Sequence, residues 1–288
     1  MSQVNARSPN GDRFPFLLHD GQDRFISQRI RKRGSWEPFE TRVMLSLLHP
    51  GDVVVDIGAN IGWYTITLAL QIGGSGRIFA FEPEPDNADL LEQNVALNRL
   101  SNVKVFRCAL SDTPGTLTLV KSITNMGDHR LSSQPANPAL QVDVPVETLD
   151  RLVAIGAVDL TSVRNIKIDT QGAEVLVLRG ARDALVNLSF DCAVFVEFSP
   201  NLLRHHGIDF PRQFLDVLNG LARDMFMINA RYRTLHRIGP SELDDFSASC
   251  MGGSDDVGID LILAPRNDKS IQRFCRFYAH LVKSTVLS

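Results

Sequence analysis

The chain has 288 residues, of which 44% are hydrophobic and 22% are charged, and its formal net charge at pH 7 is -3. This composition is typical of a globular protein and excludes a fibrous or largely disordered chain. The near-neutral charge gives no basic field that would favour nucleic acid or an anionic membrane. Residues 1–13 are polar and no apolar run approaches about 20 residues, so neither a signal peptide nor a membrane span is expected.

Apolar, strand-like runs alternate with helix-like stretches along most of the chain. The predicted strands, in chain order, are residues 52–57, 77–82, 103–107, 163–169, 192–198, 225–230 and 258–264. The predicted helices lie between them, at residues 62–72, 86–98, 174–185 and 211–221. Strands that alternate with helices form crossover units, so we expect an α/β fold with a mostly parallel sheet and helices on both faces.

The remaining segments lack this regular alternation. Residues 122–141 contain two prolines and several serines and asparagines, and they form either a substrate-covering loop or an insertion. The link between the last two strands is predicted to be a loop, because it contains Gly239-Pro240 and Gly252-Gly253, and it allows an antiparallel final pair. Residues 1–40 are expected to pack over the domain as a cap.

The four cysteines, Cys108, Cys192, Cys250 and Cys275, are far apart in the sequence and form no CxxC pair. Zinc sites and disulfide frameworks usually have closer spacing. Cys192 falls within a predicted strand and Cys108 directly follows one, so buried free thiols are expected. This use of cysteine fits a reducing cytoplasm.

The first glycine-containing turn is the sharpest local signal in the sequence. A valine-rich strand ends at Asp56 and Ile57 and runs into Gly58, whose spacing to Gly62 lets a ligand approach the backbone closely. Dinucleotide-binding turns read GxGxxG, whereas this chain has Asn60 at the middle position. The Asp56 carboxylate would repel a pyrophosphate and attract a cation, so the turn favours S-adenosylmethionine over a nicotinamide dinucleotide.

Two further signals follow at the ends of the next strands. Glu82 ends the second strand, about 20 residues past the turn, where an acidic side chain can accept both ribose hydroxyls. Ser111 and Asp112 follow the third strand, and their position suits either a contact to the adenine edge or a local cap or Asx turn.

Several stretches together resemble the motifs of the FkbM family of methyltransferases. They are residues 51–65, Phe81-Glu82-Pro83, Asn94 with Asn98, Glu147-Thr148-Leu149-Asp150, residues 166–174 and residues 177–181. The likeness covers roughly residues 37–200. Many family members have an acidic residue where this chain has Gln171, and this departure weakens any role in holding a metal or acting as a base at that position.

The resemblance implies a class I, Rossmann-like fold that depends on S-adenosylmethionine, with a seven-stranded sheet. The methyltransferase domain would cover residues 41–267, and a C-terminal helix would follow at 268–288. The activity implied is methyl transfer to a hydroxyl of a small molecule or saccharide. The cofactor-binding residues would be Asp56, Gly58, Asn60 and Gly62 at the methionine half, Glu82 at the ribose, and Ser111 and Asp112 near the adenine.

An alcohol acceptor needs a base, and the sequence offers three candidates. Asp169 ends the fourth predicted strand and should project into the same cleft as Asp56. His129 lies in the irregular stretch and titrates near neutrality, and Glu197 ends the fifth strand. A divalent metal at Asp169 is compatible with oxygen ligands, although no spacing in the sequence requires one.

Two other functions use the same kind of sheet. One is a nucleotide-binding oxidoreductase of the NAD(P) type, against which Asp56 and the missing middle glycine argue. The other is a catalytically silent subunit that keeps the S-adenosylmethionine fold. A nucleic-acid partner is not expected, because no stripe of basic and aromatic residues is present. The acceptor would be selected by residues 14–39, 122–141 and 201–211.

Overall fold

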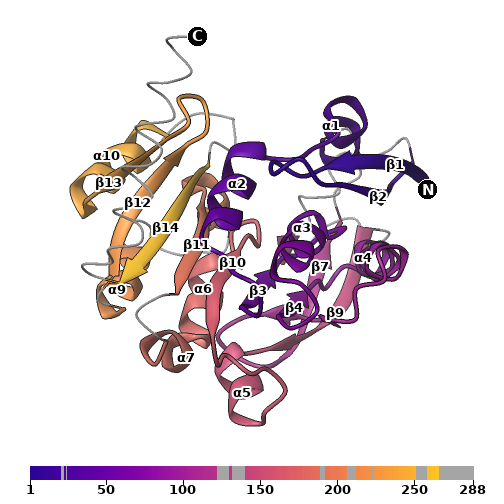
Figure 1. Cartoon of the computed structure of the whole chain (residues 1–288). Coiled ribbons are helices and arrows are strands. Elements are labelled where there is room, and N and C mark those ends of the chain that lie inside the picture. The colour runs from indigo at the N-terminus through magenta and orange to yellow at the C-terminus, as the bar shows by residue number, and fades with distance from the viewer. Residues whose placement is uncertain are drawn as a thin grey trace, which may run out of the picture.

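The computed structural model describes residues 1–20, 23, 25–121, 130–131, 140–188, 192–205, 212–221, 223–250 and 258–265. Its centre is an eight-stranded sheet (Figure 1). The strands, from one edge to the other, are β13 (Thr234–Ile238), β12 (Arg223–Asn229), β14 (Ile259–Pro265), β11 (Ala193–Phe198), β10 (Val163–Ile168), β3 (Val53–Ile57), β4 (Arg77–Phe81) and β5 (Val103–Phe106). Strands β11, β10, β3, β4 and β5 are parallel neighbours, whereas β14 is antiparallel to both β11 and β12.

This arrangement confirms the predicted α/β fold with a mostly parallel sheet and an antiparallel strand near its end. The sheet has one strand more than the seven expected, because β13 adds an edge beyond β12. The prediction of a loop between the last two strands was wrong. That link contains β13 and also α10 (Pro240–Ser249), in which Pro240 occupies the first helical turn, where its missing amide hydrogen costs nothing.

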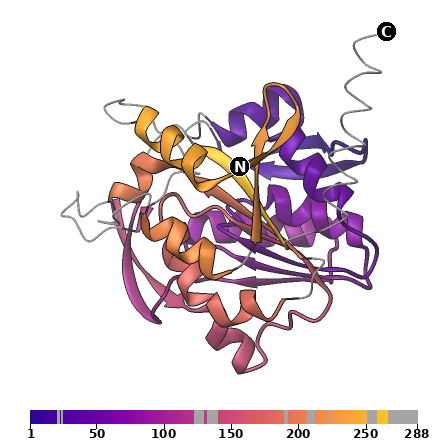
Figure 2. The same cartoon turned by 90° about the vertical axis from the view of Figure 1, so that its left-hand side faces the viewer.

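Each face of the sheet carries its own hydrophobic core, and Figure 2 shows helices on both sides. Along β3, Val54 and Asp56 point to one face, whereas Val53, Val55 and Ile57 point to the other. The first face is covered by α2 (Pro38–Ser46), α3 (Trp63–Ile72) and α4 (Pro85–Leu97). The second is covered by α5 (Leu149–Ala154), α6 (Glu174–Gly180), α7 (Arg182–Val186), α8 (Pro200–His205), α9 (Arg212–Gly220) and α10.

A second, four-stranded sheet was not predicted. It contains β6 (Ala109–Leu110), β9 (Gln141–Glu147), β7 (Gly115–Val120) and β8 (Arg130–Leu131), in that order. Within β7 only Leu119 is buried, and Leu117 is exposed. Leu119 and the buried residues of β9 form a small core of their own.

The predicted cap is built from a hairpin and a helix. Strands β1 (Ser2–Arg7) and β2 (Arg13–Leu18) pair antiparallel, and α1 (Ile26–Arg33) follows (Figure 1). The rings of Phe14 and Phe16 pack against Trp63 of α3, with centroids 5.8 and 5.9 Å away. The hairpin therefore buries aromatic surface on the helix that begins at the glycine turn.

Asn94 and Asn98 tie this hairpin to α4. The two residues are four positions apart, so they share one helix face. The buried Asn94 amide nitrogen donates to the carbonyl oxygens of Leu17 (3.1 Å) and Ile61 (2.9 Å), and its oxygen accepts from the Leu17 amide (2.6 Å). Asn98 donates to the carbonyl oxygen of Pro15 (2.9 Å). This geometry gives a structural reason for the spacing of the two asparagines.

Other expectations have mixed outcomes. Cys108 and Cys192 are buried free thiols, as predicted, and Cys250 is also buried and free. Within the described part of the chain, no helix is long and apolar enough to cross a membrane. His129 and the C-terminal helix predicted over residues 268–288 lie outside the described residues.

Candidate functional site

The glycine turn after β3 passes the end of β10 at very short range. Gly58 has φ of 82°, and a Cβ atom at this position would lie 1.8 Å from the carbonyl oxygen of Asp169. The amides of Gly58 and Ala59 donate to the carbonyl oxygen of Phe81 at 3.0 and 2.9 Å. Gly62, with φ of 93°, then begins α3. The turn therefore links the ends of β3, β4 and β10, and only glycine fits at position 58.

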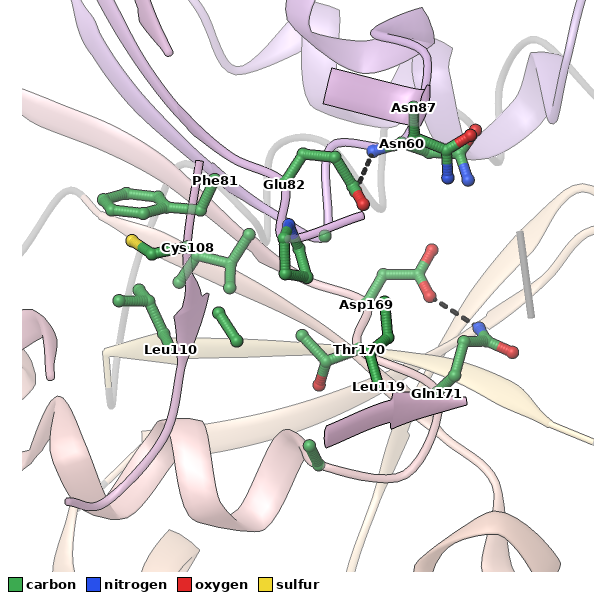
Figure 3. Close-up of a pocket in the computed structure, with 15 residues that line it drawn as sticks. Asn60, Phe81, Glu82, Asn87, Cys108, Leu110, Leu119, Asp169, Thr170 and Gln171 are labelled. Atoms are coloured by element: carbon green, nitrogen blue, oxygen red, sulfur yellow. Dashed lines mark hydrogen bonds between the residues drawn. The ribbon is translucent and has the colours of Figure 1, made fainter. Parts of the chain in front are cut away.

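A cavity opens beside this turn (Figure 3). Phe81, Cys108 and Leu110 gather at one end of it, whereas Glu82 and Asp169 lie toward the other. The full lining is Ile57, Gly58, Asn60, Phe81, Glu82, Pro83, Asn87, Cys108, Ala109, Leu110, Leu119, Asp169, Thr170, Gln171 and Ala173. The cavity thus has an apolar end and a polar end, as expected of a site for a ligand with both characters.

Glu82 is held rigidly at the polar end. Its Oε2 accepts from the Asn60 amide (2.8 Å) and its Oε1 from the Glu84 amide (2.9 Å). Burial raises the pKa of this carboxyl to about 8, although the two backbone hydrogen bonds oppose the rise. Each carboxylate oxygen has a second lone pair, so Glu82 can still accept hydrogen bonds from a ligand's hydroxyl groups.

The raised pKa of Glu82 predicts a pH-dependent stability. The native pKa of about 8 exceeds the ordinary 4.5, so this stabilising contribution is complete below pH 4.5 and is lost as pH rises through 8. One pKa unit corresponds to about 1.4 kcal/mol, so the free energy of unfolding should fall by a few kcal/mol between pH 5 and pH 8. Urea denaturation at several pH values measures this change.

Two variants separate the contribution of Glu82 from that of other groups. Glu82→Gln should flatten the fall in unfolding free energy. Glu37→Gln should flatten it less, since the pKa of Glu37 rises only to about 7. Equal slopes in the wild type and in Glu82→Gln would contradict the assignment.

Asp56 faces away from this cavity. It is in register with Lys167 of the neighbouring strand, and both side chains lie on the face covered by α2 and α3. Its Oδ2 accepts from the Thr65 hydroxyl (2.6 Å), and its Oδ1 is buried without a hydrogen-bond partner among the described residues. Burial raises the pKa of Asp56, and Lys167 opposes that rise. Neither Asp56 nor Gly62 lines the cavity.

Lys167 lies at the centre of a group of carboxylic acids that we name the acidic cluster. Its members are Glu37, Glu40, Asp56, Asp169, Glu197 and Asp260. Lys167 Nζ contacts Asp169 Oδ2 at 2.6 Å and lies 4.5 Å from the centroid of the Tyr64 ring. The Tyr64 hydroxyl donates to Glu37 Oε2 (2.7 Å). One lysine thus offsets the charge of several carboxyl groups. The pKa of each carboxyl group except Asp169 is raised, and burial is the main cause.

Gln171 joins Asp169 to Glu197. Its amide nitrogen donates to Asp169 Oδ1 (2.8 Å) and to Glu197 Oε2 (2.7 Å). Burial tends to raise the pKa of Asp169, but Lys167 and the surrounding hydrogen bonds hold it below its ordinary value. Burial and the negative charge of Asp169 raise the pKa of Glu197 well above its ordinary value. Two neighbouring carboxyl groups therefore differ strongly in their affinity for a proton.

A smaller cavity adjoins this pair. It is lined by Glu40, Met44, Tyr64, Lys167, Ile168, Phe195, Val196, Glu197, Ile228 and Asp260. Its walls come from α2, α3 and the strands β10, β11, β12 and β14. The N-terminal segment therefore supplies part of the wall through α2.

The structure brings together some of the residues predicted from the sequence. Gly58, Asn60, Glu82 and Asp169 line the larger cavity, and Glu197 lines the smaller one. Ser111 and Asp112 do not line either cavity. The lining of the larger one ends at Leu110, and the Ser111 carbonyl oxygen would lie 1.9 Å from a Cβ atom at Gly180, so this segment packs tightly against α6.

The sequence did not predict the central position of Lys167 or the bridging role of Gln171. It also did not point to the carboxyl groups of Glu37 and Glu40. Lys167 alternates with Ile166 and Ile168 in a buried strand, and a lysine there is a signal for a charged partner. Among the described residues, no group of three histidine, cysteine or acidic side chains is arranged to hold a metal ion.

Comparisons with known proteins find similar methyltransferases. A family model described as the methyltransferase FkbM domain matches residues 56–225. Hexuronic acid methyltransferase AglP of Haloferax volcanii is 32% identical over 181 residues, which cover 62% of this chain and 66% of that protein. The 31-O-demethyl-FK506 methyltransferase FkbM of Streptomyces tacrolimicus is 28% identical over 163 residues, or 48% of this chain and 62% of that protein.

A solved FkbM methyltransferase from Methylobacillus flagellatus aligns with a TM-score of 0.44 and 17% identity, over 75% of this chain and 44% of that one. The chain matches about two thirds or less of the length of the two curated relatives, at 66% and 62%.

Proposed function

Because the chain belongs to the FkbM methyltransferase family, we propose that it transfers a methyl group from S-adenosylmethionine to a hydroxyl of a saccharide or other small molecule. The observation that carries this function is the buried Glu82 carboxyl in a cavity beside the tightly packed Gly58 turn. The relatives named for a hexuronic acid and for an O-demethyl natural product support the choice of a hydroxyl acceptor.

S-adenosylmethionine fits the chemistry of the larger cavity. Phe81, Cys108 and Leu110 offer an apolar end for adenine, in place of the predicted Ser111 and Asp112. Glu82 offers acceptors for the ribose hydroxyls, and the carboxylate of Asp169 favours a cationic sulfonium nearby. When bound, this cofactor supplies a methyl group that is already activated for displacement.

The chain must align the acceptor hydroxyl, exclude water and remove a proton. We assign Glu197 as the base that removes this proton, because its pKa is raised whereas that of Asp169 is lowered, so Glu197 binds a proton more tightly. Asp169 keeps its negative charge through its contact with Lys167 and interacts with the positive end of the methyl donor. His129 remains a candidate from the sequence that lies outside the described residues.

We propose that the smaller cavity receives the acceptor hydroxyl. It adjoins Glu197, and its wall carries Glu40 and Asp260 against a single lysine. An anionic acceptor would add a further buried negative charge beside carboxyl groups whose pKa values are already raised, so we expect neutral or amine-bearing acceptors to be preferred to a hexuronic acid. Buried free thiols support a reducing cytoplasm as the place of this reaction.

Calorimetry with S-adenosylmethionine and with NAD tests the cofactor. We expect S-adenosylmethionine to bind, NAD not to bind, and Glu82→Ala to weaken S-adenosylmethionine binding about 10-fold, or about 1.4 kcal/mol, which is the usual net contribution of a hydrogen bond. Transfer of a labelled methyl group to matched neutral, amino and uronic sugars tests the acceptor. NAD binding without S-adenosylmethionine binding would favour an oxidoreductase, and cofactor binding without transfer to any acceptor would favour a silent subunit.

A further inference from the structure

The turn that carries Gln171 is held in an unusual conformation. Gln171 has φ of 54°, in the left-handed region that few residues other than glycine adopt, and Gly172 follows with φ of 106°. The buried Glu174 carboxylate accepts from the Thr170 amide (2.8 Å), the Thr170 hydroxyl (3.1 Å) and the Gly172 amide (3.0 Å). These bonds fix the turn, and strained backbone of this kind is concentrated at functional sites.

The side chain of Gln171 uses both hydrogens of its amide group. One points to Asp169 Oδ1 and the other to Glu197 Oε2, at 2.8 and 2.7 Å. The remaining oxygen of Asp169 is bonded by Lys167 Nζ at 2.6 Å. The amide nitrogen therefore lies between two carboxyl groups, at hydrogen-bond distance from both (Figure 3 draws its bond to Asp169).

We propose that Gln171 is a positioning residue that allows this site to hold Asp169 and Glu197 together without a divalent metal ion. A pair of carboxyl groups that meet at one point needs a donor or a cation between them. The Asp169 and Glu197 carboxyl groups hydrogen-bond each other, and the neutral amide gives each of them a further hydrogen bond. The Gln171 amide thereby orients Glu197 as a base. Because the amide is uncharged, it does not lower the pKa of Glu197 as a cation would.

The residue at position 171 therefore determines whether an amide or a metal ion bridges Asp169 and Glu197. Gln171→Glu would put a third carboxyl group where the amide now stands, within 3 Å of the oxygens of Asp169 and Glu197. Repulsion among the three would be relieved by a proton or by a divalent cation, and hard cations prefer oxygen ligands. The expected change in methyl-transfer rate rests on the proposed function, whereas the expected change in manganese affinity does not.

The experiment compares the wild type with Gln171→Glu, Gln171→Leu and the control Gln93→Glu, which makes the same change at an exposed glutamine of α4. Manganese chloride is titrated into each protein by calorimetry. Labelled methyl transfer is then measured from pH 6 to pH 9, with manganese or with a chelator. Leucine removes the amide without adding charge, so it separates loss of the bridge from gain of a metal site.

We expect the chelator to leave wild-type transfer unchanged, and manganese to bind Gln171→Glu at least 10-fold more tightly than it binds the wild type or Gln93→Glu. Without metal, Gln171→Glu should lose at least 10-fold in transfer rate, and its rising pH limb should shift upward because added negative charge raises the pKa of Glu197. Manganese should restore part of this loss, whereas Gln171→Leu should lose activity that manganese does not restore.

Two results would overturn the inference: inhibition of the wild type by the chelator, or manganese affinity of Gln171→Glu equal to that of Gln93→Glu. If no acceptor is methylated by any of these proteins, the proposed function fails. The calorimetric comparison still decides the role of Gln171 in that case, because it requires neither acceptor nor turnover.

Discussion

Replacing Gly58 with alanine is expected to abolish S-adenosylmethionine binding and to lower the free energy of unfolding by about 2–5 kcal/mol. The left-handed backbone at φ of 82° costs an alanine about 1–2 kcal/mol. The new Cβ atom would lie 1.8 Å from the carbonyl oxygen of Asp169, so the ends of β3 and β10 must separate, which adds about 1–3 kcal/mol of overpacking. Urea denaturation and calorimetry with the cofactor measure the two effects.

Gly74→Ala is the matched control. A Cβ atom at Gly74 would have no other atom within 4 Å, so this variant should unfold and bind the cofactor as the wild type does. Cofactor affinity in Gly58→Ala that equals that of Gly74→Ala would show that the cofactor binds away from this turn.

Replacing Glu197 with glutamine is expected to lower kcat by about 10²–10⁴-fold, which is the usual contribution of a positioned general base. Cofactor affinity should change little, because Glu197 lines the smaller cavity and not the larger one. The wild-type rate should rise with pH as Glu197 loses its proton, since its pKa lies well above the ordinary value. Steady-state kinetics across pH should find that rising limb missing in Glu197→Gln.

Asp169→Asn and Glu92→Gln complete the comparison. Asp169→Asn removes the charge that faces Lys167, so it should weaken cofactor binding as well as lower kcat. Glu92→Gln changes an exposed residue paired with Arg107 and should leave both unchanged. If Asp169→Asn alone abolished the pH dependence, Asp169 would be the base and Glu197 would not.

The predicted site residues that line the larger cavity are those whose position follows from local order along the chain. Gly58 and Glu82 end adjacent parallel strands, and the carboxyl ends of such strands meet at one edge of a sheet. The cavity that they share could therefore be anticipated from strand pattern and turn chemistry alone. The family resemblance extended this expectation to the reaction.

The residues that sequence analysis missed depend on contacts between distant segments. Glu37 and Tyr64 approach Lys167 only because α2 and α3 pack side by side on one face of the sheet. Asp56 was expected in the cofactor cavity, but strand alternation turns its side chain to the opposite face. The second sheet was missed although the apolar residues of β7 and β9 alternate, because its strands pair with one another and lie outside the series of strands and helices that forms the main sheet. Strand β13 and α10 were missed because Gly239-Pro240, a common loop signal, begins a helix here.

The side chain of Asn94 has a consequence for motion in this protein. It bonds to the backbone of Leu17, 77 positions away, and also to the carbonyl oxygen of Ile61 within the glycine turn. The Asn94 amide group therefore holds both the N-terminal hairpin and the glycine turn. Fraying of the hairpin removes a hydrogen bond that also orders the turn, and opening of the turn does the same to the hairpin. A ligand that orders the turn should therefore slow hydrogen exchange in β2, which the ligand does not contact.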